Sequence, residues 1–164
     1  MQSIRCLVLS DSHGRVDLVN TAIKLAGRFD ALFFLGDGLS DLMYATDGDL
    51  RFPIYAVKGN CDFGSPLSDR NVYKIDSITL MDKKIVFTHG DLYGVKYGLD
   101  GVINLAANTN ADIVLFGHTH EPYEQYLDGI YYFNPGALCP DRAPSSAGIL
   151  TLTEQGVLFS FLEL

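Results

Sequence analysis

The chain has 164 residues, of which 48% are apolar and 20% are charged. This composition is ordinary for a globular protein and excludes an intrinsically disordered chain. We expect residues 1–164 to form a single domain, because this length is enough to bury one substantial core. The formal net charge of −8 argues against duplex nucleic acid as a partner, since proteins that bind it present a basic face.

The N-terminal residues and the cysteines indicate a cytoplasmic protein. No apolar run reaches the ~18–20 residues of a membrane span, so no membrane association is expected. The apolar run near the N-terminus is too short for the core of a signal peptide, and no small-residue cleavage site follows it. The three cysteines, Cys6, Cys61 and Cys139, are odd in number and scattered, which does not suggest a disulfide framework.

The first half of the chain predicts a β–α–β arrangement. Residues 4–9 form a short apolar run that ends in polar residues, which is typical of a buried strand. Apolar residues at helical spacing predict a helix over 16–26, and Gly27 ends it. Two further buried strands are predicted at 31–35 and 54–57. This order favours a parallel sheet with right-handed crossovers.

The remaining elements indicate an α/β (α+β) fold in which two packed sheets are covered by helices. Ser40 and Asp41 resemble the start of a second helix, with a cap formed there, and a further helix is predicted over 99–108. The dipeptide Asp128-Gly129 is a strong signal for a hairpin turn. The remaining predicted strands are, in chain order, 77–80, 84–88, 112–116, 123–127, 130–133, 147–153 and 157–162.

Polar residues follow five of the predicted strands at the point where each strand ends. Loops beyond the carboxyl ends of strands converge in an open α/β sheet, and ligands bind in the crevice that they form. We therefore expect these polar residues to gather in one cluster. They are, in chain order, Asp11-Ser12-His13, Gly36-Asp37, Gly59-Asn60, His89-Gly90 and Gly117-His118-Thr119-His120.

All four histidines of the chain lie in these segments. A single buried histidine is more often hydrogen-bonded in the core than bound to a metal. Four histidines in one cluster, accompanied by two aspartates and an asparagine, favour a metal site instead. The candidate ligands are Asp11, His13, Asp37, Asn60, His89, His118 and His120.

The types and number of these ligands indicate two divalent cations. Imidazole and carboxylate without thiolate suit Mn²⁺, Fe, Co, Ni or Zn, whereas an all-oxygen cage would suggest Mg²⁺ or Ca²⁺. Seven side chains exceed the three or four protein ligands of one catalytic ion. Two ions ~3.5–4 Å apart need a bridging carboxylate. Asp37, which has Gly36 and Gly38 on either side, is the natural bridge.

The motif series D-x-H, G-D, G-N-x-D, H-G and G-H-T-H runs from Asp11 to His120 and resembles the calcineurin-like metallophosphoesterase superfamily. The chain length, and Cys61 within the third motif, are similar to the small prokaryotic branch of YfcE-type phosphodiesterases. Residues 134–136, Asn-Pro-Gly, resemble a later turn of that branch. Each motif alone is a weak signal, but five motifs in the right order are specific.

The resemblance implies a four-layer sandwich of two mixed β-sheets flanked by helices. It also implies metal-dependent hydrolysis of a phosphodiester, in which a hydroxide that bridges two ions attacks phosphorus in line. Mn²⁺ is the expected ion, and a small phosphate ester is the expected substrate. By resemblance, one ion would be bound by Asp11, His13, Asp37 and His120, and the other by Asp37, Asn60, His89 and His118.

Three positions depart from the pattern of this family. Larger members carry histidine at the position of Cys61, and cysteine is a poorer proton donor to a leaving group. We therefore expect good leaving groups to be favoured, although a small residue packed beside the site is an equal alternative. Asp91 stands where relatives often have a second histidine, and an exposed position is favoured over a supporting carboxylate. Ala137 replaces a serine that is frequent in the branch, and Asp62 is expected to orient a ligand.

Two other functions stay open at the level of the sequence. One is a phosphomonoesterase with the same site. The other is a non-catalytic interaction scaffold like the retromer subunit that has this fold, although a scaffold need not keep all seven ligands. The motif order argues against an amidohydrolase that uses the same ions, and the lack of cysteine ligands argues against a closed structural site. A homo-oligomer is also compatible with the sequence.

Overall fold

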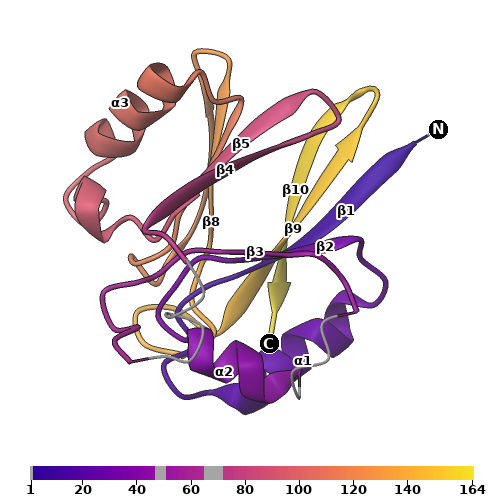
Figure 1. The fold of residues 1–164 in the computed structure, drawn as a ribbon, viewed down its shortest axis with the longest axis vertical. Coiled ribbons are helices and arrows are strands. Elements are labelled where there is room, and N and C mark those ends of the chain that lie inside the picture. The colour runs from indigo at the N-terminus through magenta and orange to yellow at the C-terminus, as the bar shows by residue number, and fades with distance from the viewer. Residues whose placement is uncertain (1, 47–50, 65–71) are drawn as a thin grey trace.

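The structure, a computed structural model, describes residues 2–46, 51–64 and 72–164, and Figure 1 shows its ribbon. The strands in this part of the chain form two five-stranded sheets, with the orders β10-β9-β1-β2-β3 and β4-β5-β6-β8-β7. Both sheets are mixed, because each contains parallel and antiparallel strand pairs.

The first sheet combines the two ends of the chain, and the second is built from its middle. The strands of the first sheet are β1 (Ser3–Leu9), β2 (Ala31–Phe34), β3 (Ile54–Ala56), β9 (Ser146–Thr153) and β10 (Gly156–Glu163). The strands of the second sheet are β4 (Ile75–Leu80), β5 (Lys83–Thr88), β6 (Ile113–Leu115), β7 (Pro122–Leu127) and β8 (Ile130–Pro135).

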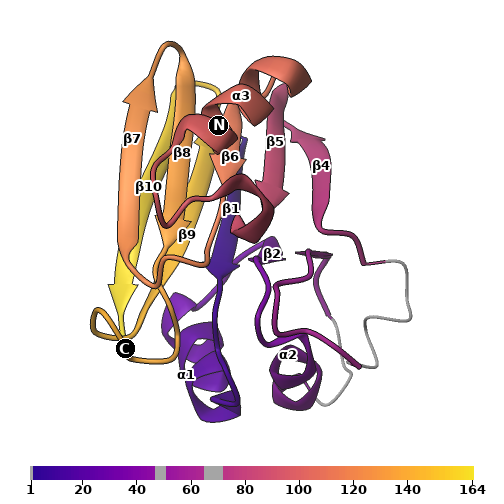
Figure 2. The same ribbon diagram turned by 90° about the vertical axis from the view of Figure 1, so that its left-hand side faces the viewer.

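Three α-helices in the described part of the chain cover the outer faces of the two sheets. Helices α1 (Val16–Ala26) and α2 (Leu39–Ala45) pack on the first sheet, and α3 (Asp100–Thr109) packs on the second. Helix α3 lies on the opposite side of the molecule from α1 and α2 in both Figure 1 and Figure 2. The order of layers is therefore helix, sheet, sheet, helix, as the sequence predicts. None of these helices has the length and apolar character of a membrane span.

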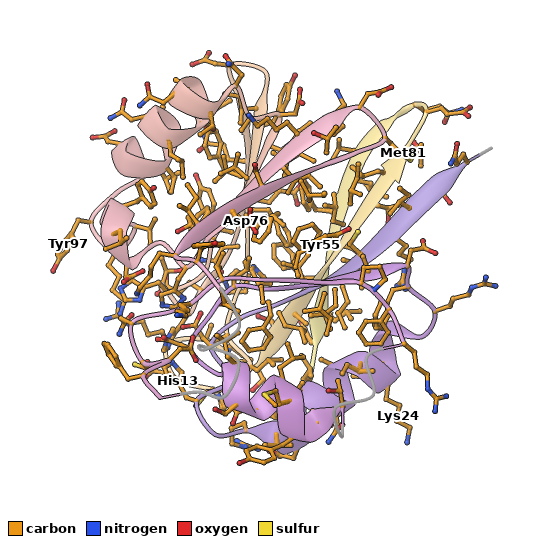
Figure 3. All side chains as sticks on the ribbon, in the orientation of Figure 1. His13, Lys24, Tyr55, Asp76, Met81 and Tyr97 are labelled. Carbon is orange, nitrogen blue, oxygen red and sulfur yellow. The ribbon has the colours of Figure 1, made fainter. Side chains whose placement is uncertain are left out.

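The core between the two sheets is rich in aromatic side chains. Tyr55, which Figure 3 labels in the interior between the sheets, has its ring 5.1 Å from that of Phe33, and Phe33 makes an edge contact with Phe87 at 5.2 Å. Phe133 stacks on Phe159 with a ring-centroid distance of 4.3 Å. The strands bury side chains on both faces, because one face meets the opposite sheet and the other meets a helix. This double burial explains the continuous apolar runs of the central strands.

Parallel pairing brings the carboxyl ends of β1, β2 and β3 to one edge of the first sheet and those of β5 and β6 to one edge of the second. Backbone hydrogen bonds join the loops that follow these strands. Asp11 N donates to Gly36 O at 3.0 Å, and Gly117 N donates to His89 O at 3.0 Å. Between the two sheets, His118 N donates to Oδ2 of Asp11 at 3.0 Å. Strand ends from both sheets therefore share one region, which is where the polar segments of the sequence lie.

The structure differs from the predicted elements in a few places. Helix α2 begins at Leu39, after Gly38, and has no side-chain cap, so the expected cap at Ser40 or Asp41 is wrong. The turn expected at 81–83 contains only Met81 and Asp82, both with positive φ. Met-Asp lacks the usual sequence signal for a two-residue turn, so the sequence predicts a turn that is one residue too long. The short 3-10 helix η1 (Asp91–Tyr93) has no counterpart in the sequence prediction.

We predict that Gly148→Ala destabilises the packing between the sheets. Gly148 lies on β9, and a Cβ atom there would overlap Cε1 and Cζ of the Phe133 ring. Overpacking of this kind typically lowers the free energy of unfolding by about 1–3 kcal/mol. Urea denaturation measures the free energy of unfolding of the wild type, of the two single variants Gly148→Ala and Phe133→Leu, and of the double variant. Because leucine is smaller than phenylalanine, the double variant should be more stable than the sum of the single losses implies. Strict additivity would contradict the predicted contact.

Candidate metal centre

All seven candidate ligands lie in loops that directly follow strands, at the shared edge of the two sheets. His13, labelled in Figure 3, projects from the loop between β1 and α1. Potential ligand atoms of the acidic, histidine and cysteine side chains lie within 4.8 Å of one another in three overlapping groups. The groups are Asp11, His13 and His120; His13, Asp37 and Cys61; and Asp37, His89 and His118.

The first group joins the D-x-H motif to the last histidine of the G-H-T-H motif. Nε2 of His120 lies 3.1 Å from Oδ1 of Asp11 and 3.3 Å from Nε2 of His13. Nε2 of His13 lies 3.6 Å from the same Asp11 oxygen. Residues more than 100 positions apart in the chain thus direct three polar atoms toward one point.

The third group contains the other two histidines, and Asn60 lies beside it. Nε2 of His89 lies 3.0 Å from Nδ1 of His118 and 3.2 Å from Oδ1 of Asn60. The same nitrogen is 3.3 Å from Oδ2 of Asp37. Oδ2 of Asp37 also lies 3.8 Å from Nε2 of His13 in the first group. Asp37 is therefore adjacent to both groups, as a bridging ligand would be.

The two buried carboxylates each use one oxygen inside the protein and present the other to the imidazole rings. Oδ2 of Asp11 accepts hydrogen bonds from the Ser10 hydroxyl and from His118 N, whereas Oδ1 faces His120 and His13. Oδ1 of Asp37 accepts from Cys61 N at 2.7 Å, whereas Oδ2 faces His89. This division fixes both carboxylates and leaves one oxygen of each directed at the cluster.

Backbone strain is concentrated in the same residues. Nine residues other than glycine have positive φ in the described part of the chain, and five of them are candidate ligands. Such conformations cost about 1–3 kcal/mol each and persist where the surrounding structure enforces them, most often at functional sites. The five are Asp11, His13, Asp37, His118 and His120, with φ between 45° and 68°.

Asp62 supports the site through the backbone. Its two carboxylate oxygens accept hydrogen bonds from four backbone N–H groups, those of Asp37, Gly38, Leu39 and Gly59, at 2.7–3.0 Å. The side chain is buried. Asp62 therefore holds the loop after β2 against the loop after β3, and with it the backbone of Asp37. The sequence predicts that Asp62 orients a ligand, and the structure identifies the contacts as backbone contacts.

Asp41 and Asp141 are two supporting carboxylates that sequence reasoning missed. Oδ2 of Asp41 accepts from Ser12 Oγ at 2.5 Å and from Gly14 N at 2.8 Å, which holds the backbone on either side of His13. Oδ2 of Asp141 lies 3.1 Å from Nδ1 of His120. A carboxylate on the far nitrogen of a histidine orients the ring and makes it a better metal ligand. Neither aspartate lies in a motif, so no local signal pointed to it.

Three more polar residues near the cluster are engaged inside the protein. Ser12 is fully buried and its hydroxyl donates to Asp41. Asp91 was expected to be exposed, but its side chain is only 13% exposed and forms an ion pair with Lys74. Asn134, from the Asn-Pro-Gly turn, donates to Gly117 O at 3.0 Å and so holds the G-H-T-H loop.

The electrostatics of the cluster follow from burial and from close pairing. Burial raises the pKa of the Asp11 carboxyl, but hydrogen bonds from His120 and His13 outweigh it, so the pKa is lowered overall. Burial and the neighbouring His89 charge lower the pKa of His118 to about 4. Burial opposes protonation of His89, but the hydrogen bond to Asp37 and the negative charges of Asp11 and Asp37 raise its pKa overall. A neutral His118 ring has a free nitrogen lone pair, which is the form that binds metals.

The donor set fits divalent cations. Ring nitrogens that face each other at 3.0 Å and 3.3 Å cannot both donate to one another, whereas a cation can accept lone pairs from both. The two buried carboxylates bring two negative charges to the same place, and buried charges are normally paired or bound to a metal. Imidazole nitrogen with carboxylate and amide oxygen suits first-row divalent ions.

A hollow of about 260 Å³ opens beside this cluster. His13, Asp37 and Cys61 from the cluster line it, together with Phe63, whose side chain is 89% exposed. Burial and the charge of Asp37 raise the pKa of the Cys61 thiol. The thiol is therefore protonated at neutral pH and faces a space that a small molecule could enter.

Comparison with known proteins agrees with the geometry of the site. The calcineurin-like phosphoesterase superfamily domain matches residues 4–156. The chain is 33% identical over 160 residues to the probable metallophosphoesterase YsnB of Bacillus subtilis, covering 96% of this chain and 89% of YsnB. It is 25% identical over 169 residues to the phosphodiesterase YfcE of Escherichia coli K12, covering 90% and 87% of the two chains.

A solved structure also shares the fold over almost the whole length of the chain. The crystal structure of a protein from Streptococcus pneumoniae, described as a predicted phosphoesterase, matches with a TM-score of 0.80 and 26% identity. The match covers 99% of this chain and 91% of that protein. With its family motifs gathered at one edge of two mixed sheets, the chain belongs to the calcineurin-like phosphoesterase superfamily.

Proposed function

We propose that the chain is a phosphodiesterase that depends on two divalent metal ions and hydrolyses small phosphate esters. The observation that carries this proposal is the position of Asp37, whose Oδ2 lies 3.3 Å from Nε2 of His89 and 3.8 Å from Nε2 of His13. A carboxylate that lies between two groups of potential ligands suits two neighbouring ions, and such pairs are typical of enzymes that cleave phosphate esters. The name of YfcE as a phosphodiesterase supports the same assignment.

We assign the ligands in two sets that share Asp37. The distances within each group support this division, because Asp11 lies beside His13 and His120 while His89 lies beside His118 and Asn60. The first set is Asp11, His13, Asp37 and His120, and the second is Asp37, Asn60, His89 and His118. We further propose Mn²⁺ as the ion, the cytoplasm as the location, and residues 1–164 as a single domain.

Divalent ions bound here would supply a nucleophile at neutral pH, by lowering the pKa of water, and would neutralise charge on the phosphate. The residues of the chain do the positioning. Asp62 and Asp41 hold the backbone of the ligand loops, so little rearrangement is needed when the ions bind. Cys61 lies at the hollow beside the cluster, where its protonated thiol can donate to a leaving group, although less effectively than an imidazolium would.

Two alternatives make different demands on the site. A phosphomonoesterase could use the same ions, and its substrate would carry one more negative charge beside the buried carboxylates. A non-catalytic scaffold would have no need for strained backbone at five candidate ligands, because strain of this kind is retained where function requires it. The strained ligands therefore favour an enzyme over a scaffold.

We predict that the protein binds two Mn²⁺ ions per chain and that Asp37→Asn removes the ability to hold both tightly. An amide is a weaker bridging ligand than a carboxylate because it carries no charge. Elemental analysis after gel filtration measures the number of Mn²⁺ ions bound per chain in the wild type and in each variant. Asp17→Asn, at an exposed carboxylate on α1, is the matched control and should retain two ions. A wild-type content that never exceeds one ion would contradict the assignment of two ions.

We predict that metal-loaded protein hydrolyses bis-p-nitrophenyl phosphate faster than p-nitrophenyl phosphate. Both esters release the same p-nitrophenol, so the expected preference for the diester rests on the similarity of the chain to the phosphodiesterase YfcE. Release of p-nitrophenol is followed at 405 nm before and after removal of metal with a chelator. Turnover of the monoester alone would show that the diesterase assignment is wrong while leaving the metal site intact.

We predict that Cys61→His selectively improves hydrolysis of esters with poor leaving groups. A general acid typically contributes ~10²–10⁴-fold, so even an imperfectly placed imidazole should raise the rate on an alkyl ester measurably. The rate on an aryl ester should change little. Rates on both esters are measured together with metal content, with Cys61→Ser as the small-residue control.

The outcome separates two roles of Cys61. If a larger ring only displaces the neighbouring Asn60, metal content and both activities should fall together. If both metals remain and both esters change equally, the leaving-group explanation is wrong.

A further inference from the structure

Lys74 forms hydrogen bonds with two of the loops that carry candidate ligands, although it lies in none of the family motifs. It precedes strand β4, and its Nζ atom donates to the backbone oxygen of Gly59 at 3.0 Å. The same ammonium donates to Oδ2 of Asp91 at 2.9 Å. Gly59 directly precedes Asn60, and Asp91 follows His89 by two residues. One cation thus contacts the segments that present two ligands of the second set.

The contact with Lys74 means that Gly59, the residue before Asn60, is hydrogen-bonded through both its N–H and its carbonyl oxygen. Gly59 N donates to Oδ2 of Asp62 at 2.8 Å, while Gly59 O accepts from Lys74. Asn60 itself is exposed, so packing around its side chain does little to fix it. The position of the Asn60 amide therefore depends on the backbone that Asp62 and Lys74 hold from opposite ends.

On the other side, Lys74 holds the segment around His89 at two points. Thr88 Oγ1 donates to Lys74 O at 2.9 Å, which fixes the residue before His89. Asp91 is largely buried, and among the described residues its Oδ1 is a buried side-chain atom without a hydrogen-bond partner. A buried carboxylate that is only half satisfied depends strongly on its remaining charged partner. Loss of the Lys74 ammonium would leave Asp91 free to move, together with the loop after His89.

The first ligand set is supported by different residues. Asp41 holds the backbone around His13, Ser10 holds Asp11, and Asp141 lies against His120. The contacts of Lys74 described above reach the loops of Asn60 and His89, both of which belong to the second set. The two sets thus have separate supports, apart from the shared Asp37.

We propose that Lys74 is a positioning residue for the second metal ion, acting by holding Asn60 and His89 at a fixed separation through Gly59 and Asp91. This inference rests on the two-ion assignment made above. It assigns a function to Asp91, which replaces the second histidine of related sequences, as the anchor for the lysine. The consequence is selective: without Lys74, one ion should bind weakly while the other binds as before.

The test is a Mn²⁺ titration of the full chain by isothermal calorimetry after metal has been removed with a chelator. In Lys74→Met, one of two binding events should weaken by about 10- to 100-fold, the range usual for loss of an outer-shell partner, and the other should change less than about threefold. Lys74→Arg keeps the charge and should retain most of the affinity. Asp91→Asn should weaken the same event, because the amide cannot pair with the ammonium as a charge.

Lys84→Met is the matched control, because Lys84 is another partly buried lysine whose ammonium donates to a backbone oxygen, that of Thr109, at 2.6 Å. It should lose some thermal stability and keep both binding events. Unchanged affinities in Lys74→Met and Asp91→Asn, or equal weakening of both events, would overturn the positioning role. A wild type that binds a single ion would instead refute the two-ion assignment, so the two failures are distinguishable.

Discussion

The fold of this protein is organised around two carboxylates that are buried where imidazole rings converge. Asp11 is 0% exposed and Asp37 is 3% exposed, and burial of an unpaired charge is too costly for a stable domain. Each carboxylate is therefore tied down through one oxygen by N–H or O–H donors and directs its other oxygen at histidine nitrogens. The strained backbone of the candidate ligands and the supporting aspartates all serve this arrangement.

The two-sheet architecture makes the arrangement possible. A single sheet would bring strand ends together in a row, whereas two facing sheets bring the ends of β1 and β2 opposite those of β5 and β6. The loops can approach closely because glycines stand where they meet. A Cβ atom on Gly59 would overlap the Asp37 carboxylate, and one on Gly36 would collide with the Gly59 backbone. Both glycines are therefore required by the distance between the loops, and Gly36 also by its positive φ of 96°.

Sequence reasoning identified the strands and the seven candidate ligands because both are local signals. A buried strand is a continuous apolar run, and the ligand-bearing residues follow it directly in the chain. Asp62, which lies within a motif, is the supporting residue that the sequence predicts. Asp41, Asp141 and Lys74 give no such signal, because each contacts a segment 15 or more positions away. The same holds for Asp91, whose burial depends on a lysine from another segment. Tertiary contacts decide these roles, and no periodicity in the sequence reports them.

The acidity of the chain is compatible with an anionic substrate when charge is considered locally. The net charge of −8 is spread over the whole molecule, and charges farther away than the Debye length of about 8 Å are largely screened at physiological salt. Within the site, both oxygens of Asp62 and Oδ2 of Asp41 already accept hydrogen bonds from backbone N–H groups. Two divalent ions beside Asp11 and Asp37 would leave the centre positive by about two charges. With both ions bound, the local field would therefore attract a phosphate ester even though the protein as a whole is an anion.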